Sequence, residues 1–242
     1  MGKMKMWYEI VNANSKEKEF IQKSIEFIQK NYSDKIHVEE LRKVEIADSL
    51  PNSSSGRTYG DKIILSRKND LERLEHIEKI DIDKIIEGED RVLFSTIYHE
   101  LWHVSTWKQY YSLYESVLKD GERDPYKAFA SQFWIEYISH KETVFAESQD
   151  VMKQFCIIFS QKRWENMDDG YFYFVKALPY YIVRSQYMGM FEEMTEKISC
   201  KELKEAVYKF ALLSQELYKQ TEKSDIEKRD CIEKQIVKLF EE

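Results

Sequence analysis

One stretch, Thr96-Ile-Tyr-His-Glu-Leu-Trp-His-Val104, contains the pattern H-E-x-x-H. On an α-helix, His99 and His103 lie on one face, about 5–6 Å apart at Cβ, so both rings can reach one ion. Zinc binds neutral imidazole readily, and catalytic zinc sites keep one position open for water. Glu100 is turned toward the same opening, where it can accept a proton from that water. The spacing therefore predicts a zinc site on a helix, with Glu100 as general base.

The residues around this pattern are apolar and neutral. Between Val92 and Trp107, Glu100 is the only carboxylate, and no Lys or Arg occurs. Burying an acid and two histidines in such a helix is costly unless they have partners, and a metal ion supplies one. The alternative without a metal is an ordinary core helix, in which hydrogen bonds satisfy the histidines and Glu100 reaches solvent. The composition of the helix favours zinc as the cofactor.

A di-iron helical bundle is a second class in which Glu100-x-x-His103 would be one ligand unit. That architecture requires a second E-x-x-H and two further inward-facing glutamates. The sequence has no second E-x-x-H, and the nearest pattern, Glu136-x-x-x-His140, has the wrong spacing. His99 would also have no role in it. The sequence therefore argues against a di-iron site.

The sequence before the motif predicts a small sheet. Strands are expected at residues 6–12, 42–48 and 61–66, where apolar residues alternate with charges or cluster. Between the second and third ranges lies the turn-rich segment 51–60, PNSSSGRTYG, which suits a hairpin. These strands place a mixed sheet in front of the motif.

Helices account for the rest of the front part. Asn14 and Glu17 form the capping-box pattern, which starts a helix that reaches about residue 31. Residues 71–86 have apolar positions three apart and suggest a helical insertion. A long apolar helix that carries the motif is expected from about residue 91 to residue 110. The front part is therefore of the α/β kind.

The second half differs in kind, because from about residue 126 it reads as successive helices. Residues 193–242 are rich in Lys and Glu, with apolar residues at intervals, which is typical of a solvated amphipathic helix pair. We therefore predict an α+β, predominantly helical chain. Residues 1–110 would form an N-terminal α/β lobe with the motif helix, and residues 111–242 a helical lobe, the two making one catalytic unit.

Composition argues against several classes of protein. With 37 basic and 44 acidic residues among 242, the net charge of -7 gives no reason to expect nucleic acid or an anionic membrane as partner. The N-terminal segment lacks the apolar region of a signal peptide, and no window approaches the ~18 apolar residues of a membrane helix. Three distant cysteines, Cys156, Cys200 and Cys231, form neither a disulfide framework nor a zinc knuckle. We expect a cytoplasmic protein, and its oligomeric state is unknown.

The residues T-I-Y-H-E-L-W-H-V resemble the active-site helix of the zincin metallopeptidase superfamily, including the uncharged flanking and internal positions. The metzincin extension is absent, because Thr106 stands in place of its glycine and Gln109 in place of its third histidine. The resemblance is therefore gluzincin-like. It implies a zincin-like fold, a zinc cofactor, a peptide or protein substrate, and a third ligand, a glutamate, on a later helix.

The segment 129–147 supplies such a glutamate. Phe133, Glu136 and His140 fall on one helical stripe, so Glu136 faces the same side as bulky apolar groups. Gluzincins often carry an aspartate four residues after the ligand, and His140 takes that position here. His140 is open to three roles: orienting a ligand, stabilising the transition state, or serving as third ligand with Glu136 in support. Weaker alternatives for the third ligand are Glu142 and Glu147.

Two further roles follow from the resemblance. In zincins an edge strand pairs with the extended substrate, and residues 61–66 are the candidate for that edge, with a place in the middle of the sheet as the alternative. The oxyanion of the transition state usually needs a further donor. The candidates for this donor are Tyr171, Tyr173, Tyr180, Tyr181 and Arg184.

The expected function is that of a zinc-dependent metallopeptidase, in which metal-activated water hydrolyses peptide bonds. Glu100 would act as general base, and His99, His103 and Glu136 would be the ligands. The alternative is a non-catalytic binding module that keeps the zincin fold with a lost or structural metal. A structural zinc site is closed by a fourth protein ligand. The sequence shows no obvious fourth ligand, which favours the enzyme.

Overall fold

The structure of the protein is a computed structural model that describes residues 7–51, 54–88, 91–119, 123–163 and 171–240, without the side chains of residues 171–176 and 240. The chain divides into two compact units, residues 1–109 with 145–148 and residues 110–144 with 149–242. The described part is mostly helical and holds a small mixed sheet, which confirms the predicted α+β, predominantly helical fold class.

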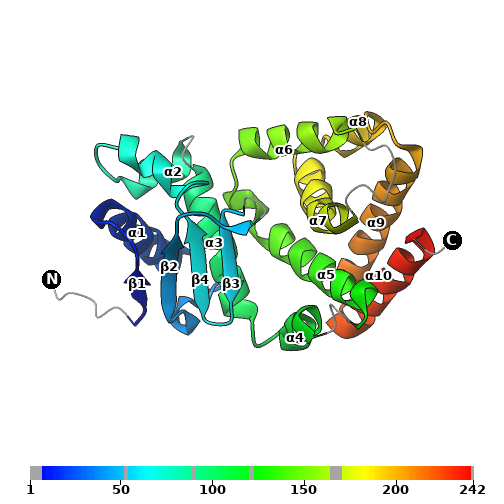
Figure 1. Cartoon of the computed structure of the whole chain (residues 1–242), viewed down its shortest axis with the longest axis horizontal. Coiled ribbons are helices and arrows are strands. Elements are labelled where there is room, and N and C mark those ends of the chain that lie inside the picture. The colour runs from blue at the N-terminus through cyan, green and yellow to red at the C-terminus, as the bar shows by residue number, and fades with distance from the viewer. Residues whose placement is uncertain (1–6, 52–53, 89–90, 120–122, 164–170, 241–242) are drawn as a thin grey trace. The chain divides into compact units, whose positions relative to one another are not determined.

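The first unit contains a mixed four-stranded sheet. Its strands are β1 (Glu9–Val11), β2 (Lys43–Ala47), β3 (Gly56–Tyr59) and β4 (Lys62–Ser66). Their spatial order is β1-β2-β4-β3, as Figure 1 shows. β1, β2 and β4 run parallel, and β3 runs antiparallel to β4. Three strands fall within the ranges where the sequence predicts strands, although residue 6 of the first range lies outside the described part.

The expected hairpin between the second and third predicted strands is wrong, because β2 and β4 are parallel neighbours. The hairpin joins β3 to β4 instead, with Tyr59 opposite Lys62 around Gly60 and Asp61. Gly60 has a φ of 62°, which glycine adopts without steric cost in a tight hairpin turn. β3 is therefore one of the two edge strands, beside β1 at the other side, and residues 61–66, the candidate for the edge, lie inside the sheet.

The first unit also contains three helices and two 3-10 turns among its described residues. They are α1 (Ser15–Tyr32), α2 (Ile82–Glu87) and α3 (Arg91–Thr106), with 3-10 turns η1 (Val38–Glu40) and η3 (Leu71–His76). α3 packs against β3, β4 and α1 (Figure 1). The expected insertion at residues 71–86 is thus η3 and α2 rather than one helix. Phe20, Ile63 and Leu101 contribute buried side chains to this core.

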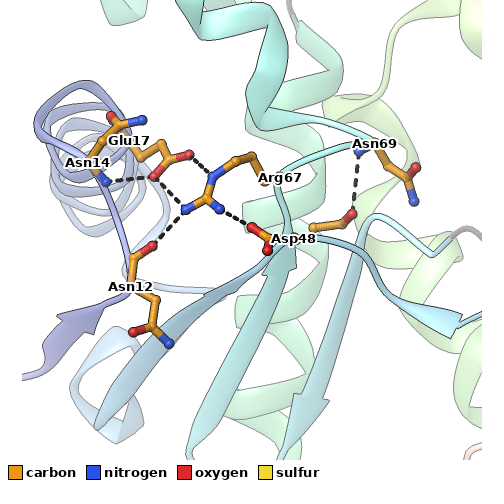
Figure 2. A network of polar contacts seen from close by, with 7 residues as sticks. Asn12, Asn14, Glu17, Asp48, Arg67 and Asn69 are labelled. Atoms are coloured by element: carbon orange, nitrogen blue, oxygen red, sulfur yellow. Dashed lines mark hydrogen bonds and ion pairs between the residues drawn. The ribbon is translucent and has the colours of Figure 1, made fainter.

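A polar network ties the carboxyl ends of the parallel strands to the start of α1 (Figure 2). Asn12, Asp48 and Arg67 directly follow β1, β2 and β4. Arg67 donates to the Glu17 carboxylate and to the Asn12 carbonyl, each at 2.8 Å, and also to the Asp48 carboxylate. The side chains of Asn14 and Glu17 each accept from the other's backbone N–H, which confirms the predicted capping box.

The second unit is helical. It contains α4 (Tyr111–Lys119), α5 (Pro125–Thr143), α6 (Gln149–Gln161), α7 (Tyr171–Tyr187), α8 (Phe191–Glu196), α9 (Lys201–Lys219) and α10 (Asp225–Phe240), and η4 (Val144–Ala146) follows α5. α5 packs against α4, α7, α9 and α10, so its buried residues point in several directions (Figure 1). Asp124 caps α5, and Pro125 occupies its first turn. None of the described helices has the length and apolar character needed to cross a membrane.

Candidate metal centre

The two histidines of the motif lie together on α3. Their Nε2 atoms are 3.0 Å apart, and the ring planes are inclined by 81°. His103 is 6% exposed, and His99 is half-buried. Two nitrogens bound to one tetrahedral zinc at about 2.0–2.1 Å would lie about 3.3 Å apart. A hydrogen bond between the rings needs one proton between these nitrogens, and a metal ion can take the place of that proton.

Glu100 lies on the same helix and faces the edge strand. Its side chain is 7% exposed, and its Oε2 atom lies 2.6 Å from the hydroxyl oxygen of Thr58 on β3. The same hydroxyl lies 3.1 Å from the backbone oxygen of Glu100. A Cβ atom at Gly56 would lie 2.7 Å from Cγ and 2.8 Å from Oε1 of Glu100. The glycine thus leaves room for the carboxylate, and the threonine fixes its direction.

A second buried carboxylate, Asp70, lies beside α3. It accepts hydrogen bonds from Thr96 at 2.7 Å and from Ser55 at 3.2 Å, and it is 6% exposed. Thr96 lies one turn before Glu100 on the same helix. Burial raises the pKa of Asp70, the two hydroxyls oppose that rise, and the charge of Glu100 adds to it. Sequence reasoning missed Asp70, because nothing in its neighbourhood marks it as buried.

Glu136 and His140 lie one turn apart on α5 in the second unit. The Oε1 atom of Glu136 accepts from Gln132 Nε2 at 2.7 Å, and its Oε2 atom accepts from the Tyr180 hydroxyl of α7 at 3.2 Å. The ring centroid of His140 lies 3.8 Å from that of Tyr180, with the planes inclined by 61°. His140 is 3% exposed, whereas Glu136 is half-buried. Tyr180 therefore contacts both residues predicted for the third-ligand position.

The two weaker candidates for the third ligand lie in different units. Glu142 is on α5, where its carboxylate accepts a hydrogen bond from the Tyr218 hydroxyl of α9. Glu147 belongs to the segment 145–148, which is part of the first unit, and it is 8% exposed. Within single units, the structure brings together His99, Glu100 and His103 on α3, and Glu136 and His140 on α5.

The residues predicted as oxyanion donors have different surroundings in the structure. Tyr181 is fully buried and shares a hydrogen bond with Thr195 at 2.9 Å, so its hydroxyl belongs to the core of the second unit. Tyr180 donates to Glu136, and the Arg184 guanidinium lies 5.3 Å from the centroid of the Tyr180 ring. The side chains of Tyr171 and Tyr173 lie outside the described part of the chain.

The donor atoms on α3 and α5 are imidazole nitrogens and carboxylate oxygens. Catalytic zinc sites use these donor types, and the two Nε2 atoms on α3 lie 3.0 Å apart. The side chains present therefore fit zinc. No protein-family model matches the chain, and comparison with curated proteins and with solved structures gives no match.

Proposed function

We propose that this chain is a zinc-dependent metallopeptidase with a zincin-like architecture. The observation that carries the proposal is the pair of Nε2 atoms 3.0 Å apart on α3, the same helix that carries the Glu100 carboxylate bonded by Thr58. His99 and His103 would hold the ion. Glu136 is our proposed third ligand, as the gluzincin-like resemblance implies, and His140 either supports it or takes its place.

The chemistry divides between the ion and the protein. A bound zinc ion supplies Lewis acidity, which polarises a carbonyl group and lowers the pKa of water to about 7. Glu100 accepts the proton of the attacking water and returns it to the leaving amine as general acid. The Thr58 hydroxyl holds the carboxylate in one orientation, so the base keeps its position while the proton moves.

An extended peptide suits the edge of the sheet beside this base. Ser66 N–H donates to the Ser55 carbonyl, which sets the alternation of the antiparallel ladder. Gly56 and Thr58 consequently direct their backbone N–H and C=O groups away from β4. Such an edge can bind a peptide through main-chain hydrogen bonds. Because the side chain of Thr58 contacts Glu100, a peptide bound along this edge would lie close to the proposed base. This placement supports a peptide as the substrate.

The test separates metal binding from chemistry. Glu100→Gln removes the base and leaves both histidines, so we expect unchanged zinc content and loss of peptide hydrolysis by at least about 10²–10⁴-fold. Zinc content and turnover of an unbiased peptide library are measured for wild type and variant. Glu87→Gln, which changes an exposed glutamate of the same unit, is the matched control and should behave as wild type.

Two outcomes would contradict the proposal in different ways. Hydrolysis by Glu100→Gln at the wild-type rate would remove Glu100 as the base. Wild-type protein that binds one zinc yet cleaves no peptide of the library would favour a non-catalytic binding module with a structural metal.

A further inference from the structure

Each of the two oxygens of the Glu136 carboxylate accepts a hydrogen bond from a neutral side chain. Gln132, one turn earlier on α5, donates at 2.7 Å to Oε1, and Tyr180 of α7 donates at 3.2 Å to Oε2. A glutamine and an acid one turn apart commonly interact on a helix surface, so the first bond alone has a purely structural explanation. The second bond comes from another helix, 44 residues away in the sequence. Together the two donors fix both the position and the rotation of the carboxylate.

Tyr180 is itself held by its neighbours. The Arg184 guanidinium lies 5.3 Å from its ring centroid and 4.8 Å from that of Phe155, and the His140 ring packs against it at 3.8 Å. Cation–π and aromatic contacts of this kind restrict the tyrosine ring. A phenol has a single proton to donate, and here that proton is directed to Glu136.

We propose that Gln132 and Tyr180 are positioning residues, which hold the Glu136 carboxylate in the orientation that binds the metal ion. This inference rests on the proposed function, because it takes Glu136 as the zinc ligand. Both donors are neutral, so they orient the carboxylate without forming the ion pair that a lysine or arginine would form. Hydrogen-bond partners of metal ligands typically contribute 10–100-fold to metal affinity.

The experiment measures zinc affinity by competition with a chromophoric chelator at one fixed pH. Tyr180→Phe removes the phenol oxygen, and Gln132→Met removes the amide while keeping its length. We expect each variant to bind zinc about 10–100-fold more weakly than wild type. The visible spectrum of the Co²⁺-loaded protein should also change in each variant, because it reports the geometry of the ligands. The matched controls are Tyr187→Phe and Gln154→Met, which change exposed residues of the same unit.

The controls distinguish positioning from folding. The unfolding temperatures of the metal-free variants and of their controls should agree to within a few degrees. If the two residues acted only through packing, the variants would instead unfold at clearly lower temperatures than the controls. Wild-type zinc affinity and Co²⁺ spectrum in both variants, with wild type binding zinc, would overturn this inference and leave the proposed function standing. Wild-type protein that binds no zinc would overturn both.

Discussion

Glu100 occupies a buried site that the edge strand shapes around it. Gly56 leaves space for its side chain, and Thr58 bonds its carboxylate at 2.6 Å. Neither residue stands out in the sequence, since both belong to a turn-rich segment 42 or more residues before Glu100. Their contribution depends on how β3 lies on α3, and that packing is a tertiary property.

We expect Thr58→Val to slow peptide hydrolysis without loss of zinc. Valine keeps the branched shape and removes the hydroxyl, and a hydrogen bond to a charged group contributes about 1.5–3 kcal/mol. The corresponding fall in kcat/KM is about 10–100-fold. Thr58→Ser, which keeps the hydroxyl, should retain most of the activity. Equal activity of the valine variant and wild type would show that Thr58 does not position Glu100.

The buried carboxylate of Asp70 leads us to predict how the stability of the fold depends on pH. Burial raises its pKa in the folded protein, so the folded protein holds this proton more tightly than the unfolded chain. The stability that it contributes is fully present below the unfolded pKa of about 3.9 and is lost as pH rises through the folded pKa. Arg73 lowers that pKa and Glu100 raises it, but burial is the largest cause.

Asp70→Asn should therefore be more stable than wild type at neutral pH, because the variant has no charge to bury. The amide can still accept from one hydroxyl and donate to the other, so the hydrogen bonds of Ser55 and Thr96 can be kept. The difference should shrink as pH falls toward about 4. Denaturant unfolding of metal-free protein across this range measures it. A variant less stable than wild type at neutral pH would contradict the burial argument.

At the scale of elements, the Arg67 network predicts that removing the arginine strongly lowers the free energy of unfolding. Arg67 bridges three strand ends and Glu17, whose side chain is 2% exposed. Arg67→Met would leave that carboxylate without its arginine. Breaking a fully buried pair costs about 3–5 kcal/mol. Because the Arg67 side chain is 32% exposed, we expect about 2–3 kcal/mol here.

Lys108→Met is the control for this change. It removes a pair with Glu40 in which the lysine is 79% exposed, and such solvent-exposed pairs contribute little to stability. Denaturant unfolding of both variants gives the comparison. Equal losses of stability in the two variants would show that the network in Figure 2 does not fix α1 to the sheet.

The sequence predicted those elements whose local pattern carries their structure. The capping box of Asn14 and Glu17 started α1 correctly, and apolar alternation located β2. β3 was missed because its four residues, Gly-Arg-Thr-Tyr, are mostly polar and show no alternation of apolar residues. Strand direction was also missed, since parallel pairing of β2 and β4 depends on distant segments rather than on the turn between them.

The same distinction applies to the candidate site. The closeness of His99 and His103 follows from helical spacing alone, and the structure shows their rings in contact. The contact between Tyr180 and Glu136 joins two helices that are distant in the sequence, so spacing could not reveal it. Sequence reasoning named both residues but could not choose Tyr180 among 16 tyrosines.

At the scale of the whole molecule, our proposal assigns ligands to both compact units. The first unit provides two histidines and the base on α3, and the second provides a hydrogen-bonded glutamate on α5. A chain of this kind should gain stability from zinc, since an ion that binds only the folded protein shifts the unfolding equilibrium. The central claim is that the motif histidines bind this ion.

The most direct measurement is the zinc content of purified wild type, His99→Ala, His103→Ala and the control His76→Ala, which changes an exposed histidine. We expect about one zinc per chain in wild type and in the control, because a catalytic zinc site holds one ion with three protein ligands. His99→Ala and His103→Ala should each lose the ion. Full zinc occupancy in both of these variants would contradict the proposed site.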